Sequence, residues 1–276
     1  MNLLGLIAYP AGHSLSPKIQ NALLQANQIE GYYHAFNVEP SQLDKAMQGL
    51  RALNVTGLNV SMPFKQAVIQ YLDETTPLAE HLQAVNVIKN VDGRLIGTNT
   101  DGDGFWQSLP NQQKHANVVI LGTGGAARAI MATAAQYGVQ KLTVFNRMHA
   151  DWSARTKRVQ ELGGTIAQLV DLADEVALTN ALAEADVLIN TTTVGMLDDV
   201  SLLTAKQIAQ LPTHTLVIDI IYSNQQTTLL KLASQRGLDT QNGLAMLIQQ
   251  GALAFEYWFN QPADRNLMQK IIGANL

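Results

Sequence analysis

Short apolar runs alternate with amphipathic stretches along the first part of the chain. The runs end in polar or turn-forming residues, as strands do, and the stretches between them carry apolar residues at helical spacing. We predict helices over Pro17–Gln28 and Ser41–Leu53. Strands are predicted at Leu3–Tyr9, Tyr32–Val38, Gly57–Met62, Ala84–Lys89 and Leu95–Asn99. This alternation indicates an α/β domain.

A second alternation of strands and helices follows, and its first strand runs directly into glycines. The strands are predicted at Val118–Leu121, Leu142–Phe145, Thr165–Val170, Asp186–Asn190 and Leu216–Ile221. Parallel strands joined by helices indicate a doubly wound, Rossmann-type nucleotide-binding domain. The predicted fold class is therefore α/β with two domains, an N-terminal substrate domain and a Rossmann-type domain.

The two patterns meet near Asp101–Gly104, where glycines interrupt the chain and a helix through Phe105–Leu109 is predicted to follow. The last predicted helix, Leu244–Phe259, has an apolar pattern suited to packing back on the first domain. We therefore predict a discontinuous first domain and an inserted nucleotide domain. Their predicted limits are residues 1–101 plus 242–276 for the first and residues 102–241 for the second.

The stretch Asn117–Ala135, which reads NVVILGTGGAARAIMATAA, predicts a buried strand, a tight turn and a helix. A Cβ at Gly122 or Gly124 would block both the turn and the approach of a pyrophosphate to the backbone N–H groups that open the helix. A glycine turn that serves packing alone is the competing interpretation.

The end of the next strand favours the nucleotide site. Asn146 and Arg147 lie about 20 residues beyond the glycines, where the ribose of a dinucleotide is expected. NAD sites usually place an acid there, whereas an arginine suits the 2′-phosphate of NADP. The sequence therefore predicts NADP as the cofactor.

Composition excludes several classes of protein. The chain has 276 residues, 47% of them apolar, and a net charge of −4, without the basic excess of a nucleic-acid binder. Cysteine is absent, and the six histidines show no metal-ligand spacing, so we expect no metal. No run approaches the roughly 18 apolar residues of a membrane span. The N-terminal run lacks the charged start of a signal peptide, and we expect a cytoplasmic protein with no membrane partner.

Polar residues recur at predicted strand ends, often at alternate positions that share one face of an extended chain. They are Ser14 with Ser16, Asn59 with Ser61, Asn86 alone, and Asn99 with Asp101. Because Pro17 forces Ser16 into an extended conformation, Ser16 could serve only as a helix N-cap. Ser14 has no comparable local role.

Lys65 and Asp101 are the candidates for proton transfer. Lys65 follows Pro63 just past a predicted strand end, where open α/β sheets bind ligands, although most lysines are solvated surface charges. Asp101 closes the string GTNTD at another strand end, where it could also cap the next helix. In one crevice the carboxylate would orient the ammonium. With a nicotinamide, the pair suits hydride transfer at a polyhydroxylated carbon, with Lys65 as proton donor and no metal.

Taken together, the motifs resemble the shikimate dehydrogenase family, and particularly its quinate/shikimate branch. The matching strings occur in the family's order over nearly the whole chain. They are AYPAGHSLSP, NVSMPFKQ, AVNVI, GTNTDGDG, LGTGGAARA, FNR, INTTTVGM and GLAMLIQQGA. The resemblance implies an enzyme of aromatic amino-acid synthesis that reduces 3-dehydroshikimate to shikimate with NADPH.

The resemblance also implies a role for each matching residue. Ser14 and Ser16 would bind the substrate carboxylate, and Lys65 and Asp101 would be the catalytic pair. The ring hydroxyls would be held by Asn59, Ser61, Asn86 and Asp101. Tyr222 and Gln250 would be further substrate contacts, although packing between domains would also explain both. The cofactor would lie against Gly122, Gly124, Gly125, Ala126, Asn146, Arg147, Thr192 and Gly243.

Four positions depart from the family's pattern, one of them Asn224, which replaces the proline usual after Tyr222. Ser61 and Met148 each stand where many members have threonine, and Asp151 replaces the second basic residue usual after Arg147. One arginine at the 2′-phosphate, with an acid free to bind a ribose hydroxyl, predicts weaker selectivity for NADP. A quinate or quinate/shikimate dehydrogenase that uses NAD is thus an alternative, as is a non-catalytic metabolite sensor. We expect a monomer or a homodimer.

Overall fold

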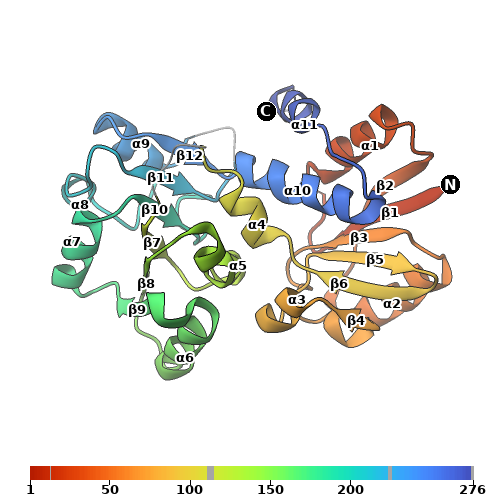
Figure 1. The fold of residues 1–276 in the computed structure, drawn as a ribbon, viewed down its shortest axis with the longest axis horizontal. Coiled ribbons are helices and arrows are strands. Elements are labelled where there is room, and N and C mark those ends of the chain that lie inside the picture. Colours follow the sequence, from red (N-terminus) through yellow and green to blue (C-terminus); the bar gives the residue numbers. More distant parts are fainter. Residues whose placement is uncertain (13, 111–114, 223–225, 275–276) are drawn as a thin grey trace. The chain divides into compact units, whose positions relative to one another are not determined.

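A computed structural model of the protein describes residues 1–12, 14–110, 115–222 and 226–274. The chain forms two compact units (Figure 1), Met1–Gly104 with Ile248–Leu276, and Phe105–Leu247. Among the described residues, each unit contains one six-stranded sheet with helices packed on it. The two-domain α/β fold expected from the sequence is confirmed.

The sheet of the first unit is mixed. In spatial order its strands are β2 (Gly31–Asn37), β1 (Asn2–Ala8), β3 (Gly57–Val60), β5 (Val87–Val91), β6 (Arg94–Thr98) and β4 (Glu74–Thr75). β1 lies parallel to both β2 and β3, whereas β5 is antiparallel to β3 and β6. The predicted strand at Ala84–Lys89 begins three residues later, at Val87, because the Val85 N–H bonds the carbonyl of Lys65 beyond the end of β3.

The core of the first unit follows from the apolar runs. Ile7, Leu58 and Ile88, on three neighbouring strands, are fully buried and pack against Met47 and Leu50. The helices that hold this unit's residues are α1 (Ser16–Ala26), α2 (Leu43–Ala52), α3 (Pro77–Leu82), α4 (Asp101–Trp106), α10 (Leu244–Phe259) and α11 (Arg265–Gly273), with α4 ending and α10 beginning in the second unit. The short 3₁₀ helices are η1 (Pro40–Gln42) and η2 (Ile69–Tyr71).

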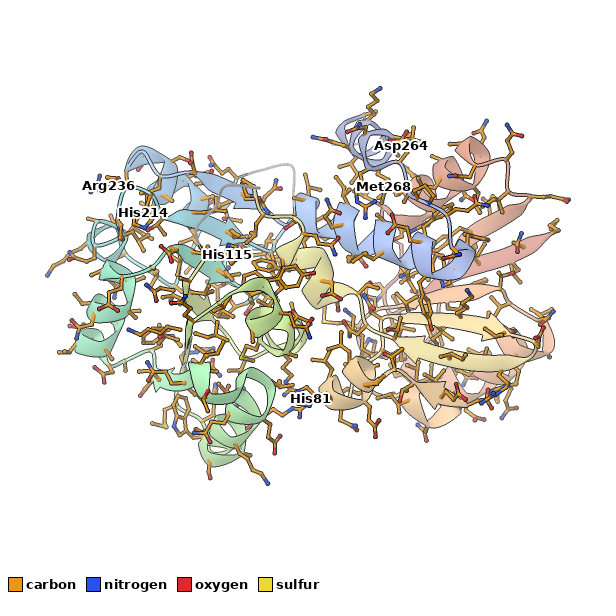
Figure 2. The ribbon with its side chains drawn as sticks, viewed as in Figure 1. His81, His115, His214, Arg236, Asp264 and Met268 are labelled. Carbon is orange, nitrogen blue, oxygen red and sulfur yellow. The ribbon has the colours of Figure 1, made fainter. Side chains whose placement is uncertain are left out.

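Two helical predictions need correction. The helix expected from Phe105 to Leu109 is α4, which begins earlier, because the side chain of Asn99 accepts the backbone N–H of Asp101. α10 has the predicted limits, but α11 follows it. Asp264 caps α11 by accepting the N–H of Leu267, and Met268 (Figure 2) is fully buried near α10. The cap residue before an apolar face was the sequence signal for this helix.

The sheet of the second unit is entirely parallel. Its strands, in spatial order, are β12 (Thr240–Asn242), β11 (Leu216–Asp219), β10 (Val187–Asn190), β7 (Asn117–Leu121), β8 (Lys141–Asn146) and β9 (Ala167–Asp171). The chain starts at the centre with β7, winds outward to β9, and returns to β10 on the other side. This is the doubly wound order, whose switch point lies between β7 and β10.

Helices connect the strands of the second unit. They are α5 (Gly125–Thr133), α6 (Trp152–Gly163), α7 (Glu175–Ala183), α8 (Ala205–Ile208) and α9 (Thr228–Gln235), with the 3₁₀ helices η3 (Ala134–Tyr137) and η4 (Gly164–Ile166). α7 and α9 bury leucines, and α8 buries Ile208, against β7, β10 and β11, while α5 packs on α6. The central strands are buried along their length, as strands covered by helices on both faces must be.

Within the described residues, no helix combines the length and hydropathy that a membrane crossing requires. The same residues hold no group of three or more His, Cys, Asp or Glu side chains placed to bind a metal ion.

Candidate active site

The structure brings Lys65 and Asp101 together, although they lie 36 positions apart in the sequence. Lys65 Nζ donates to Asp101 Oδ2 at 2.6 Å. The lysine side chain is 28% exposed and the aspartate 9% exposed, so the pair is reachable from solvent on the lysine side. Such a pair can present an oriented N–H donor to an oxygen that is gaining negative charge.

A network of amides holds the Asp101 carboxylate in one orientation. Asn86 Nδ2 donates to Asp101 Oδ1 at 2.8 Å and to Thr100 Oγ1 at 3.1 Å. Asn86 Oδ1 accepts the backbone N–H of Thr100 at 2.8 Å. Asp101 is the first residue of α4 and uses its side chain for these contacts, so it is not the helix cap that the sequence also allowed. Thr100 was missed, because nothing in GTNTD distinguishes it from a surface threonine.

Tyr33, on β2, links the amides to the serines of the α1 start. Its hydroxyl donates to Asn59 Oδ1 at 2.8 Å, and Asn59 Nδ2 donates to the carbonyl of Asn86 at 3.3 Å. Burial raises the pKa of Tyr33 far above its ordinary value, and a hydrogen bond with Ser16 lowers it only in part. Sequence reasoning missed Tyr33, because the adjacent Tyr32 and Tyr33 point to opposite faces and only the sheet decides which is buried.

At the start of α1, Ser14 takes the local role that was expected of Ser16. Ser16 is the first residue of α1, and Ser14 Oγ accepts its N–H at 3.2 Å, so Ser14 rather than Ser16 satisfies the helix start. The suggestion that Ser16 is the N-cap is therefore wrong. Its hydroxyl instead bonds Tyr33. An unbroken series of hydrogen bonds thus runs from Ser14 through Tyr33 to the Lys65–Asp101 pair.

Gln250 lies on α10, whose backbone is tied to the same network. The Thr100 hydroxyl donates to the Gln250 carbonyl at 3.1 Å. A Cβ on Gly104 would come within 2.6 Å of Gln250 atoms, so the glycine lets α4 pack directly on α10.

Ser61, half-buried just after β3, joins the sheet through its backbone, where its N–H donates to the Ile7 carbonyl at 3.0 Å.

In the second unit, the glycine turn follows β7 at the switch point. Gly122 has a φ of +104°, and a Cβ there would lie 2.8 Å from side-chain atoms of Thr191 and Thr192. Packing therefore explains Gly122. It does not explain Gly124 and Gly125 at the start of α5, where an added Cβ would meet no protein atom within 4 Å. This open cradle below a helix N-terminus, which continues through Ala126, fits the pyrophosphate of a dinucleotide.

A buried carboxylate organises the ends of β10 and β11. Asp219 accepts from Asn190 Nδ2 at 3.1 Å, from the Thr227 hydroxyl at 2.8 Å and from the Ile221 N–H at 3.1 Å, and burial raises its pKa. Asn190 Oδ1 in turn accepts the Thr192 hydroxyl at 2.8 Å. Asp219 thus fixes the segment that carries Thr192 and the segment that leads to Tyr222.

Tyr222 and Gly243 lie next to each other in this unit's fold. Gly243 donates its N–H to the Ile221 carbonyl at 3.1 Å, and a Cβ on it would come within 2.0 Å of the Ile220 carbonyl oxygen, which only glycine avoids. The Tyr222 side chain is partly exposed, and burial of its hydroxyl end raises its pKa. Tyr222 is the one proposed substrate contact that belongs to the second unit. Asn224, which departs from the family's pattern, lies outside the residues that the structure describes.

The end of β8 meets the glycine turn through Thr123. Asn146 Nδ2 donates to Thr123 Oγ1 at 3.0 Å, and Arg155 Nη1 donates to the same oxygen at 2.8 Å. Arg147 is exposed. In addition to the single arginine expected here, α6 brings Arg155 to the turn. Asp151 is also not free, since its carboxylate accepts from Arg155 Nε at 2.8 Å and this contact lowers its pKa.

Sequence models of known families match most of the chain. The shikimate dehydrogenase substrate binding domain matches residues 6–88, and the shikimate 5′-dehydrogenase C-terminal domain matches residues 243–272. The C-terminal domain of the alanine dehydrogenase/PNT family matches residues 97–225. A shikimate dehydrogenase (NADP(+)) of Symbiobacterium thermophilum is 42% identical over 97% of this chain and 92% of its own. The chain belongs to the shikimate dehydrogenase family.

Solved structures agree with this membership. Shikimate 5-dehydrogenase from Listeria monocytogenes, in complex with shikimate and NAD, is 36% identical with a TM-score of 0.90, covering 99% of this chain and 96% of its own. Shikimate 5-dehydrogenase from Thermus thermophilus, in complex with NADP(H) and shikimate, is 31% identical with a TM-score of 0.86 and full coverage of both chains. The resemblance of the sequence motifs is thereby confirmed, and the chain is a member of a family of oxidoreductases.

Proposed function

We propose that this protein catalyses the reversible NADP-dependent reduction of 3-dehydroshikimate to shikimate. The contact that carries the proposal is the 2.6 Å bond between Lys65 and Asp101, fixed by Asn86 within a shikimate dehydrogenase fold. Curated relatives at about 40% identity over nearly the full chain have the activity in their names, which supports the same reaction here.

NADPH, when bound, would supply the hydride, and side chains of the first unit would donate the proton and hold most of the substrate. As the substrate carbonyl is reduced, its oxygen needs a proton, and Lys65 donates it from Nζ. Asp101 holds the ammonium in place and accepts a ring hydroxyl. Asn59, Ser61 and Asn86 hold the remaining hydroxyls.

Ser14 and Ser16, at the start of α1, bind the substrate carboxylate. Both serines are half-buried, and the hydrogen bond from the Ser16 N–H to Ser14 Oγ fixes their relative position. Gln250 and Tyr222 are proposed as further contacts.

The proposed cofactor residues are those of the glycine turn, the end of β8 and two neighbouring segments. Gly124 and Gly125 leave room for the pyrophosphate, and Asn146 with Arg147 lies at the ribose. Gly122, Ala126, Thr192 and Gly243 complete the set. The ion pair of Asp151 with Arg155 supports NADP over the NAD-dependent quinate alternative, because one oxygen of the Asp151 carboxylate already accepts from Arg155.

The test is steady-state oxidation of shikimate by NADP with a Lys65→Ala variant. Loss of the proton carrier should lower kcat by about 10² to 10⁴ while changing KM less. Lys45→Ala is the matched control, since Lys45 is an exposed lysine of α2 in the same unit. Unchanged turnover in Lys65→Ala would refute the role of Lys65. Assaying quinate against both nicotinamides in parallel decides the substrate, and a higher kcat/KM for quinate with NAD would establish the alternative.

Two further expectations belong to the proposal. We expect the enzyme to act in the cytoplasm, as a monomer or a homodimer. Light scattering after size-exclusion chromatography measures the assembly, and fractionation of the source cells measures the location.

A further inference from the structure

A small cavity beside Thr123 is lined by three arginines. Its walls are Thr123, Arg128, Met131, Arg155, Arg158 and Val159, contributed by the glycine turn, α5 and α6. Three guanidinium groups in one place repel each other unless acids or a bound anion balance them. If the nearby carboxylates do not neutralise the three arginines, the cavity is suited to bind an anion.

The nearby carboxylates neutralise the three arginines only in part. Arg155 pairs with Asp151 at 2.8 Å and Arg158 with Glu161 at 3.3 Å, both at solvent-exposed carboxylates. Arg128 has no carboxylate partner within the described part of the chain. Burial lowers the pKa of Arg128, and the charges of Arg158 and Arg155 lower it further. A dianion placed here would relieve this repulsion.

The guanidinium of Arg155 is held in an orientation that leaves donors for such an anion. Its Nε donates to Asp151 Oδ1 and its Nη1 to Thr123 Oγ1, so the plane of the guanidinium is fixed from two sides. A guanidinium carries five N–H groups, of which these contacts use two. The remaining donors are those that bind phosphate oxygens in pairs. Thr123 belongs to the glycine turn, so the fixed guanidinium lies at the cofactor residues.

The geometry points to Arg155, assisted by Arg128, as the group that binds the 2′-phosphate of NADP, with Asp151 acting as a positioning residue for Arg155. The inference rests on the proposed use of NADP and names the residues that select it. Asp151 occupies the position of the family's second basic residue. Arg155, four residues later on α6, supplies a positive charge in its place. Residues four apart lie on the same face of a helix, so the substitution keeps the cation at the site.

The experiment measures binding without substrate or turnover. Dissociation constants of 2′,5′-ADP and 5′-AMP, which differ only in the 2′-phosphate, are determined by calorimetry at fixed ionic strength. Arg155→Gln should weaken 2′,5′-ADP by roughly 10- to 100-fold, the loss expected for charge-assisted hydrogen bonds, and leave 5′-AMP within about twofold. Arg155→Lys keeps the charge but loses the paired donors of the guanidinium, so its affinity for 2′,5′-ADP should lie between those of the parent protein and Arg155→Gln. An unchanged ratio of the two constants in Arg155→Gln would overturn the inference.

Two further variants sharpen the result. Arg236→Gln removes the same charge from an exposed arginine that follows α9, at the opposite end of this unit's sheet from α6 (Figures 1 and 2), and should change neither constant. Asp151→Asn should leave 5′-AMP binding within about twofold, whereas a loss of 5′-AMP affinity would mean that Asp151 binds the ribose. If shikimate is not turned over but the 2′-phosphate effect holds, the proposed reaction fails and this site stands.

Discussion

The two units handle their polar groups in opposite ways. In the first unit, Lys65, Asp101 and Asn86 use their hydrogen bonds on one another and on the backbone, and Tyr33 extends the network to the start of α1. In the second unit, Gly124 and Gly125 face open space, and the guanidinium of Arg155 keeps donors beyond those bound to Asp151 and Thr123.

The difference corresponds to two proposed tasks, proton transfer in the first unit and cofactor binding in the second. Proton transfer benefits from groups that are already oriented, because reorganisation during the reaction would add to the barrier. A dinucleotide must bind and leave, so its site needs space and donors that the ligand itself satisfies. The first unit is therefore complete before the ligand arrives, and the second is completed by it. Four substitutions test this contrast.

Removing the amide of Asn86 should have the largest effect on stability. Asn86→Ala leaves Asp101 Oδ1 and the Thr100 N–H buried without their partner, and the free energy of unfolding should fall by roughly 2 to 4 kcal/mol. Urea denaturation measures it. Gln70→Ala, at an exposed glutamine in the same unit, should stay within about 0.5 kcal/mol. If both variants behave alike, the network is not the preorganised structure that we describe.

The glycine turn offers a matched pair of substitutions. Gly122→Ala should destabilise the protein by roughly 1 to 3 kcal/mol, because of its positive φ and its contact with Thr191 and Thr192. Gly124→Ala should cost at most about 1 kcal/mol, since its φ is −70° and its surroundings are open. It should instead weaken NADP binding, measured by calorimetry. Equal binding by Gly124→Ala and the parent protein would show that no ligand uses that space.

The smallest expected effect is a pH dependence from Tyr33. Its pKa is raised in the folded protein, so above pH 10 the unfolded chain releases the phenolic proton while the folded chain retains it. The folded state then binds more protons, and stability falls as pH rises, by up to about 1.4 kcal/mol per pH unit. Tyr33→Phe should remove this slope between pH 10 and 11, relative to the parent in the same denaturation series. Parallel curves for the two proteins would contradict it.

The sequence by itself determined most of the elements and the identity of the chemical groups. Apolar runs require burial whatever their neighbours, which located ten of the twelve strands of the described residues to within a few residues, but not the short strands β4 and β12. The glycines after β7 indicated a turn and helix through local backbone constraints. Lys65 and Asp101 were recognisable because both follow strand ends in an α/β pattern. These features depend on neighbours along the chain, which a sequence displays directly.

Tertiary structure alone decided which groups meet. Tyr33 joins Ser16 to Asn59 across β2, β1 and β3, and Thr100 ties the active-site turn to α10, 150 positions away. Arg155 reached the glycine turn through the docking of α6, although its spacing from Asp151 was visible as a helical ion pair. The physical reason is that a hydrogen bond acts over about 3 Å, so its partners are set by how elements pack, and packing brings together residues that the sequence keeps apart.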